Sequence, residues 1–494
     1  MSGGAIGRYW LRFALLLCLT TGNAFALDAK SAIRSAEKVM GHVESVRYSG
    51  TGKLGVVGMN WNPTGPWHST DLTHYTRTID YGTASSREDL VRAQENPPAL
   101  GGERPFTDPV TEGRQVRGKY AWNQPADANP PVAPDLVLPA PAAADERGLQ
   151  IWLTPHGFLK AAAANDAVAT NGSEGGKRTT ILTFTEGKYK ISGTIDSRNL
   201  VTRIETHIAD PVLGDMPVVV AFSDYRQLKG MKFPFHILQE QGGSRTFELN
   251  VTSAEANVAG AVLTVPANVL TAKERPDNVT VEKMADGVWM LYGRASSVLV
   301  EFKDYLVVID APTNEARSLA VIAAVKKLVP NKPIKYVINT HHHFDHSGGL
   351  RTYVALGATI ITNEANKAFF QWAWSQPRTM EPDLLSEHPR EATFITYKNK
   401  YVLTDGDRTI EIYLDFGDMH DQYLSFAYLP KERILVEVDD FSAWYSTPLS
   451  LAMWNNLYGN LQRLQLDPVT IAPLHGPITP MDVWLKTLRD DTAR

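Results

Sequence analysis

The stretch that decides the fold is Thr340-His341-His342-His343-Phe344-Asp345-His346-Ser347-Gly348-Gly349, which follows the apolar run Ile334-Lys335-Tyr336-Val337-Ile338-Asn339. The run has the length and composition of a buried strand. Buried imidazole and carboxylate groups without partners cost free energy, so packing does not explain four histidines and an aspartate in six positions. Alternate residues of an extended segment point the same way, which lets His341 and His343 share one ion while Asp345 and His346 reach a second. The stretch therefore predicts a metal site at the end of a strand.

Strand and helix patterns continue on both sides of this stretch. Strands are expected at 279–282, 288–291, 297–302 and 305–310, and a helix at about 314–328 leads into the strand at 334–339. A β-rich opening that passes into strand–helix alternation is typical of two packed sheets with helices outside. The expected fold class is α+β, with a C-terminal αββα sandwich preceded by an antiparallel β-rich domain.

The motif His341-x-His343-x-Asp345-His346 resembles the signature of the metallo-β-lactamase-fold hydrolases over about residues 279–482. The remaining elements of that signature follow in the family's order. They are a structural aspartate at Asp310, the third ligand of the first metal at His420, the bridging aspartate at Asp439 and the last ligand at His475. The resemblance implies the αββα fold and a hydrolase with a dinuclear site, similar to glyoxalase II and the lactonases.

The resemblance also implies how the ligands are shared between the two ions. The first ion is assigned to His341, His343 and His420, the second to Asp345, His346 and His475, and Asp439 lies between them. Five imidazoles and two carboxylates without sulfur suit zinc best, so two zinc ions per chain are expected, with iron or manganese as alternatives. Asp345 is the expected catalytic residue, because it can orient a hydroxide that bridges the ions.

Several neighbouring residues have competing interpretations. Asp440 is the alternative to Asp439 as the bridging ligand, and Glu437, inside the preceding strand, is expected to be structural. His342 alternates away from the metals and is expected behind the ligands or at the surface. The other histidines are expected at the surface or with satisfied partners in the core: His42, His68, His74, His156, His207, His236 and His388.

Residues 27–275 are expected to form a β-rich domain, followed by the hydrolase domain at 276–494. Alternating patterns indicate antiparallel strands at 46–50, 74–79, 179–184, 189–194 and 201–206. A proline-rich segment at about 95–145 predicts a long loop within this domain, because proline interrupts helices and central strands. The patterns at 222–225, 230–235 and 239–243 resemble the half-barrel sheet of bacterial lipoprotein-carrier proteins, which implies a fold for this domain and nothing more.

The N-terminus has the pattern of a secretory signal peptide over residues 1–26. Arg8 and Arg12 precede the apolar run 13–19, and Ala24-Phe25-Ala26 offers small residues at the cleavage site. We expect a periplasmic or secreted protein with no integral membrane segment after cleavage; an uncleaved N-terminal anchor is the alternative. The single cysteine, Cys18, lies in this peptide, so no thiolate is available to the metal site.

The composition restricts the kinds of partner and of reaction that the sequence allows. A net charge of −5 and a pI near 6.2 argue against a nucleic-acid partner and favour a small-molecule substrate. A metal-bound hydroxide as nucleophile requires no protein nucleophile, and consistent with this the sequence contains no Gly-x-Ser-x-Gly elbow. Since no Lys/Arg cluster lies near the ligands in sequence, we expect an exported hydrolase of ester, thioester or lactone bonds.

Other functions stay open from the sequence. A β-lactamase or phosphodiesterase would use the same site. A mononuclear iron dioxygenase of the persulfide type would bind a single iron and have little need of His346, Asp439 and His475. In a non-catalytic carrier, the N-terminal sheet would bind a lipid or another hydrophobic ligand and the metal site would be vestigial. The aromatic stretches 369–375 and 441–445 are candidates for a pocket wall, with ordinary packing as the alternative. The oligomeric state is left open.

Overall fold

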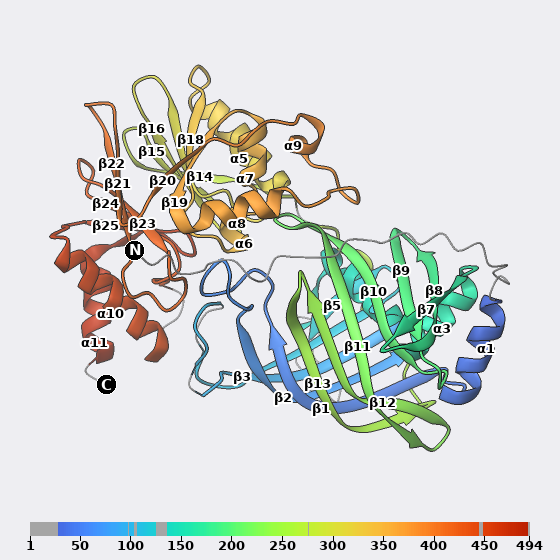
Figure 1. Cartoon of the computed structure of the whole chain (residues 1–494). Helices are drawn as coiled ribbons and strands as arrows, with labels where there is room; N and C mark the ends of the chain where they lie inside the picture. The colour runs from blue at the N-terminus through green and yellow to red at the C-terminus, as the bar shows by residue number, and fades with distance from the viewer. Residues whose placement is uncertain are drawn as a thin grey trace, which may run out of the picture.

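A computed structural model of the chain describes residues 28–96, 98–102, 106–124, 136–274, 276–443 and 448–492. The expected signal peptide at 1–26, with Cys18, lies outside these residues. The described strands form three sheets of 13, 7 and 6 strands. The largest sheet belongs to the N-terminal part of the chain, and the other two belong to the C-terminal part (Figure 1).

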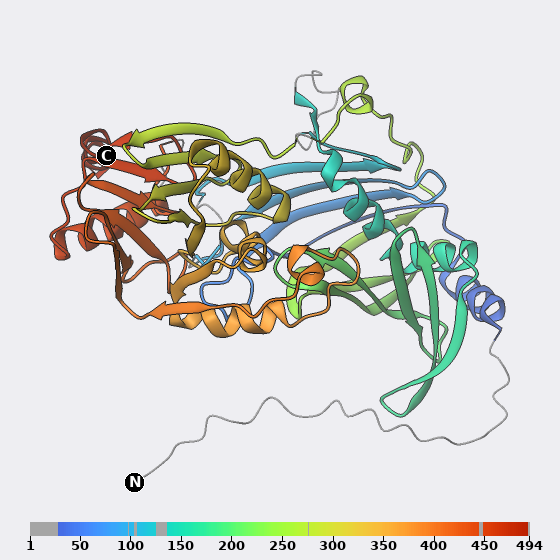
Figure 2. The same cartoon turned by 90° about the horizontal axis from the view of Figure 1, so that it is seen from above.

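The N-terminal sheet is antiparallel throughout and curved (Figure 2). Its strands run in the spatial order β6-β5-β4-β3-β2-β1-β13-β12-β11-β10-β9-β8-β7. Their bounds are β1 (Ser45–Gly55), β2 (Ser69–Asp80), β3 (Ser85–Ala93), β4 (Val110–Arg117), β5 (Tyr120–Gln124), β6 (Leu138–Pro139), β7 (Val168–Glu174), β8 (Lys177–Glu186), β9 (Tyr189–Ile195), β10 (Val201–Asp210), β11 (Gly214–Leu228), β12 (Met231–Gln241) and β13 (Ser244–Ala256). The expected antiparallel β-rich region is confirmed.

The prediction of one long loop at about 95–145 is wrong. Residues Val110–Arg117 and Tyr120–Gln124 form a hairpin, and β4 lies inside the sheet between β3 and β5. The physical reason is the distribution of the prolines, none of which falls between Pro109 and Pro125. Every backbone N–H of the hairpin is therefore free to join the sheet.

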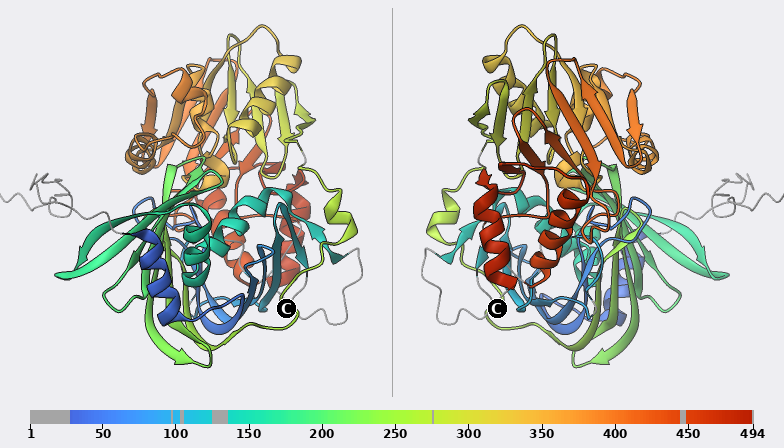
Figure 3. Two further views of the ribbon diagram at one scale, coloured as in Figure 1. Left: turned by 90° about the vertical axis from the view of Figure 1, so that its right-hand side faces the viewer. Right: turned by 90° about the vertical axis from the view of Figure 1, so that its left-hand side faces the viewer.

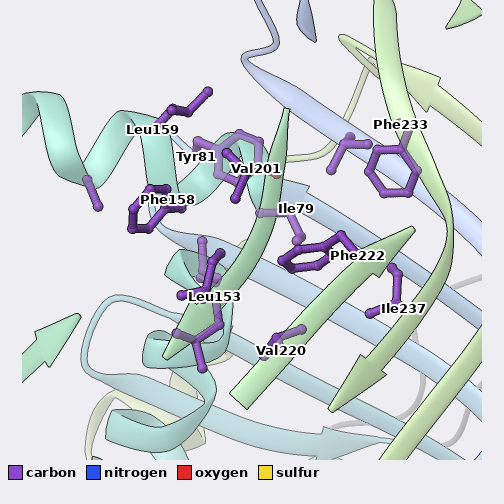
Figure 4. Close-up of a cluster of buried hydrophobic side chains, with 14 of the residues drawn as sticks. Ile79, Tyr81, Leu153, Phe158, Leu159, Val201, Val220, Phe222, Phe233 and Ile237 are labelled. Carbon is purple, nitrogen blue, oxygen red and sulfur yellow. The ribbon is translucent and has the colours of Figure 1, made fainter. Parts of the chain in front are cut away.

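Three helices pack against this sheet: α1 (Ala29–Met40), α2 (Ala144–Trp152) and α3 (Pro155–Ala164). Helix α3 begins at Pro155 because Thr154 caps it, its side chain accepting from the Gly157 N–H. Apolar side chains of the helices and strands meet in one buried cluster that includes Phe158, Val201, Val220, Phe222 and Phe233 (Figure 4). The short elements η2 (Pro141–Ala143) and α4 (Ala267–Leu270) complete the N-terminal part.

His156 makes the stability of this core depend on pH. Burial lowers the pKa of His156 to about 4, while its ring stacks on Phe233 and its Nε2 donates to the Met40 carbonyl. The unfolded state takes up the proton first, so stability that is full above pH 6.5 should be lost as the pH falls from 6.5 to about 4, by about 3 kcal/mol. Urea unfolding of wild type and His156→Phe across this range measures the effect. The free energy of unfolding of the variant should fall less steeply between pH 6.5 and about 4 than that of wild type. Equal slopes in the two proteins would contradict the role given to His156.

The C-terminal part contains two sheets that face each other. The first has the order β14-β15-β16-β17-β18-β19-β20 and the second the order β21-β22-β23-β24-β25-β26. The bounds are β14 (Thr280–Ala285), β15 (Val288–Tyr292), β16 (Ser297–Glu301), β17 (Leu306–Ile309), β18 (Ile334–Ile338), β19 (Thr359–Asn363), β20 (Phe394–Tyr397), β21 (Lys400–Thr404), β22 (Thr409–Leu414), β23 (Ser425–Leu429), β24 (Ile434–Glu437), β25 (Thr470–Pro473) and β26 (Thr479–Pro480). Pairing is parallel from β17 to β20 and between β24 and β25.

Helices cover the outer faces of both sheets, so the expected αββα sandwich is confirmed. One face of the seven-stranded sheet packs on α5 (Glu315–Leu328), α7 (Leu350–Ala355) and α8 (Glu364–Trp374). The opposite face packs on the six-stranded sheet through residues such as Val307 and Val436. Helices α10 (Pro448–Arg463) and α11 (Met481–Thr492) cover the outer face of that second sheet (Figure 3). Their side chains Trp454 and Trp484 pack against it. The remaining helices, α6 (Phe344–Ser347) and α9 (Leu384–Glu387), are single turns.

The N-terminal and C-terminal parts share buried contacts. Trp67, Val212, Leu213 and Met216 of the N-terminal part belong to the same apolar cluster as α5, α7 and α8. Arg378, after α8, donates to the carbonyls of Asp210 and Val212. None of the described helices combines the length and the apolar character that crossing a membrane requires.

Candidate metal centre

The candidate ligands lie at one edge of the sandwich, where strands of both sheets end. Asp310 follows β17, the stretch His341–His346 follows the adjacent parallel strand β18, and His420 precedes β23. Asp439 and His475 follow β24 and β25, which are also adjacent and parallel. The carboxyl ends of neighbouring parallel strands meet at the same edge, and the Ser425 N–H donates to the Thr340 carbonyl to join the two sheets there.

The first group of side chains is His341, His343 and His420. Nδ1 of His343 lies 2.9 Å from Nε2 of His420, and the three imidazoles have nitrogen atoms close enough to share one ion. His341 and His343 are both fully buried, and burial is the main cause that lowers the pKa of each, that of His343 to about 3. Both rings are therefore neutral at physiological pH and keep a free lone pair.

The second group is Asp345, His346, His475 and Asp439. Nε2 of His346 lies 2.8 Å from Nε2 of His475, and Nε2 of His475 lies 3.3 Å from Oδ2 of Asp345. Burial alone would raise the pKa of the Asp345 carboxyl, but His346 and His475 hold it well below its ordinary range. Asp345 is therefore a carboxylate, as the predicted role requires.

Asp439 lies between the two groups. Its Oδ2 is 3.4 Å from Nε2 of His341 and 3.2 Å from Nε2 of His346, while its Oδ1 is 3.3 Å from Nε2 of His475. These distances place one carboxylate in contact with both sets of imidazoles. The geometry therefore brings together all seven residues that the sequence nominates as ligands.

Asp440 points away from this centre. It lies with Asp415 and Asp418 in a separate buried cluster of three carboxyl groups. Burial, with Asp418 and Asp415 adding to it, raises the pKa of Asp440 well above its ordinary value. Glu437 is also buried, and burial raises its pKa; its Oε2 accepts from the Phe441 N–H, which is a structural contact. Asp440 is thus outside the set of side chains that surrounds Asp439.

The comparisons with known proteins bear on the C-terminal part. Residues 292–424 match the family model described as the metallo-beta-lactamase superfamily. The C-terminal region has the metallo-β-lactamase fold. None of the curated proteins matches the chain.

Solved structures similar to the chain include a metallo-β-lactamase from Pontibacter korlensis, at 20% identity over 43% of this chain and 98% of that one, with a TM-score of 0.35. Another is the metallo-β-lactamase FIM-1 from Pseudomonas aeruginosa in a mono-zinc form. It is 18% identical over 44% of this chain and 96% of that one, with a TM-score of 0.34.

In the metallo-β-lactamase region, Asp310 supports the second group from behind. Its carboxylate, fully buried, accepts from the Thr340 N–H at 2.8 Å, from the Thr340 hydroxyl at 2.7 Å and from Nδ1 of His346 at 2.9 Å. Because Nδ1 of His346 donates to Asp310, Nε2 is the ring nitrogen that faces His475 and that would bind an ion. Asp310 has φ +59, a left-handed conformation that these hydrogen bonds hold in place.

The donor atoms fit divalent cations. Among the described residues, the buried atoms Nε2 of His341, Oδ1 of Asp345 and Oδ2 of Asp439 have no hydrogen-bond partner. A buried polar atom without a partner costs free energy, and these three lie where the two groups converge. Neutral imidazoles and ionised carboxylates without sulfur are the donors that zinc, iron and manganese accept.

Two contact residues of the site are missing from the sequence prediction. Asn60 contacts His342 and His343 from the N-terminal part, and no local pattern marks it. Asp421, directly after His420, lies 2.6 Å from Nδ1 of His342, so His342 is buried behind the ligands and is not at the surface. A carboxylate next to a motif histidine is a signal that the sequence did offer.

The remaining aromatic and histidine predictions have mixed outcomes. Phe369 and Phe370 pack in the core, with the Phe369 ring 5.5 Å from that of His342, and Phe441 packs on Trp454. Ordinary packing therefore accounts for these side chains, whereas Trp444 and Tyr445 lie outside the described residues. Of the histidines outside the motifs, His68 and His156 are buried, and the others are partly or fully exposed: His42, His74, His207, His236 and His388.

Proposed function

We propose that the chain is an exported metal-dependent hydrolase whose centre takes two divalent ions, most favourably zinc. The observation that carries this proposal is the position of Asp439, one carboxylate within 3.5 Å of nitrogen atoms from both groups of imidazoles. A site for one ion needs only one such group. The match of residues 292–424 to the metallo-β-lactamase superfamily supports the hydrolase class.

The chemistry divides between the ions and the protein. Bound divalent ions supply a Lewis acid and lower the pKa of water toward roughly 7. Asp345 is held as a carboxylate, and within the described part of the chain its Oδ1 has no hydrogen-bond partner. This oxygen is therefore free to accept a hydrogen bond from an attacking water and to orient it. Asp310 keeps the His346 ring fixed while this happens.

We propose a carboxylic ester, thioester or lactone as the substrate class. In the part of the chain that the structure describes, the hydrogen-bond and ion-pair partners of the seven candidate ligands include no lysine or arginine. A phosphodiester carries a permanent charge that such side chains usually balance, so this composition favours neutral substrates. A β-lactam is neutral at the scissile bond and is the second candidate.

The test measures metal content together with hydrolysis of an ester, a thioester, a lactone, a phosphodiester and a β-lactam. Wild type should bind two zinc ions per chain and cleave one of the first three substrates. Asp345→Asn should lower kcat by about 100-fold or more, because the group that orients the water is lost. The matched control is Asp407→Asn, which replaces an exposed aspartate between β21 and β22 of the C-terminal part. This variant should behave as wild type.

Each alternative function has its own outcome in this test. One iron per chain, with activity that is unchanged in Asp345→Asn, would favour the dioxygenase and contradict the proposal. Tight metal binding with no hydrolysis of any substrate would favour a non-catalytic carrier.

A further inference from the structure

The loop between β1 and β2, residues 56–68, reaches from the N-terminal sheet to the candidate metal centre (Figure 1). The hydrogen bond from Val56 N–H to the His68 carbonyl closes its base. At Gly58, which has φ +77, a Cβ would lie 2.3 Å from the Phe344 ring, so the loop rests directly on α6. The Trp67 ring packs edge-on against the same phenylalanine.

Asn60 is the residue of this loop that contacts the histidine stretch. It is 1% exposed, its carbonyl accepts from Nε2 of His343 at 2.8 Å, and its Oδ1 accepts from Nε2 of His342 at 2.9 Å. Its amide Nδ2 donates to the carbonyls of Asn62 and Gly65. These two acceptors settle the orientation of the amide, with the oxygen toward His342.

The hydrogen bond from His343 to the Asn60 carbonyl decides which ring nitrogen is free. With the proton on Nε2, the lone pair of His343 is on Nδ1, which faces Nε2 of His420. A histidine ligand is oriented by the hydrogen bond that its other nitrogen makes. A backbone atom 283 residues away in the sequence thus selects the tautomer that a metal needs.

Trp61 holds the segment that carries the third ligand. Its Nε1 donates to the Asp418 carbonyl at 3.1 Å, and its own carbonyl accepts from the Gln422 N–H at 2.7 Å. These two contacts lie on either side of His420 along the chain. By contrast, the second group depends on Asp310, which lies within the metallo-β-lactamase region.

We propose that the loop 56–68 is a positioning element of the metal centre, in which Asn60 orients His343 and Trp61 places His420 for the first ion. The N-terminal sheet then completes the site of one ion and leaves the other to the C-terminal region. This inference rests on the proposed two-ion centre and adds a role for the N-terminal part of the chain.

The experiment measures two zinc dissociation constants for the full chain, by competition with a chromophoric chelator, and the absorption spectrum of the cobalt-substituted protein. The variants are Asn60→Ala, Trp61→Phe and a matched control in the same loop, Asn62→Ala. Asn62 caps only the loop itself, where its Oδ1 accepts from the Thr64 N–H and hydroxyl. His420→Ala identifies which of the two constants belongs to the first ion.

Asn60→Ala keeps the backbone carbonyl that contacts His343 but removes the side-chain hydrogen bonds to His342 and to the carbonyls of Asn62 and Gly65, which hold that carbonyl in place. The variant should weaken the first ion by about 10–100-fold and alter the cobalt spectrum, while the second constant changes by less than about threefold. If wild type binds two ions and Asn60→Ala has the same zinc affinities and cobalt spectrum as wild type, this inference is overturned and the proposed function still stands. An equal loss in Asn62→Ala would also overturn it. If Asn60→Ala does not fold, Trp61→Phe decides: a weaker first ion supports the inference, and an unchanged one overturns it. A wild type that binds no ion would overturn both proposals.

Discussion

Asp439→Asn is expected to abolish binding of two ions and nearly all hydrolysis. The variant keeps the size of the side chain but removes the charge that lies within 3.5 Å of nitrogen atoms from both groups. Loss of an outer-shell partner costs about 10–100-fold in metal affinity, so loss of a shared ligand should cost more than roughly 100-fold in both affinity and kcat/KM. Metal analysis after gel filtration, with kinetics on the best substrate, measures this result.

Asp440→Asn is the matched control for this prediction. Asp440 is the adjacent residue and is more deeply buried than Asp439, but it lies with Asp415 and Asp418. Because its raised pKa favours the neutral carboxyl, an amide replaces it with little change in charge. The control should keep two ions and most of the activity. A variant pair with the opposite behaviour would show that the bridging ligand is Asp440.

Asp310→Ala is expected to produce the largest loss of stability. The substitution leaves the Thr340 N–H and the His346 Nδ1–H buried without an acceptor, and each such group costs about 1–3 kcal/mol. The metal-free protein should therefore lose about 2–6 kcal/mol. Urea unfolding in the presence of a chelator, compared with wild type, measures the change.

Asp310→Asn separates stability from metal binding. Its amide keeps an acceptor for the Thr340 N–H but presents N–H groups to Nδ1 of His346, which then favours the other tautomer. We expect a smaller loss of stability and a second ion that binds about 10–100-fold more weakly. An unchanged second ion in this variant would contradict the role given to Asp310.

Much of the C-terminal region could be predicted from the sequence, because the information is local. The strands before Asp310, His341 and Asp439 are short apolar runs, and these three residues lie close to the strand ends. Parallel neighbours then bring the strand ends together without further assumptions. The seven residues therefore meet in space as their order in the motifs predicts.

Two kinds of feature could not be predicted. Some depend on contacts between residues distant in the sequence, and others are short elements within a longer segment whose overall composition indicates a loop. Asn60 contacts His343 across the interface between the two parts of the chain, and nothing in its own neighbourhood marks it. The hairpin at 110–124 could not be predicted from composition, because the prolines on both sides of it dominate the composition of the whole segment. The choice between Asp439 and Asp440 depends on the three-dimensional structure, because adjacent residues after a strand can point in opposite directions.

The seven side chains are expected to hold two ions with Asp439 between them. Diffraction from crystals grown with zinc, collected on both sides of the zinc absorption edge, tests this arrangement most directly. We predict two anomalous peaks about 3.5–4 Å apart, one among His341, His343 and His420 and one beside Asp345, His346 and His475. A single peak, or a peak only within the cluster of Asp415, Asp418 and Asp440, would contradict this arrangement.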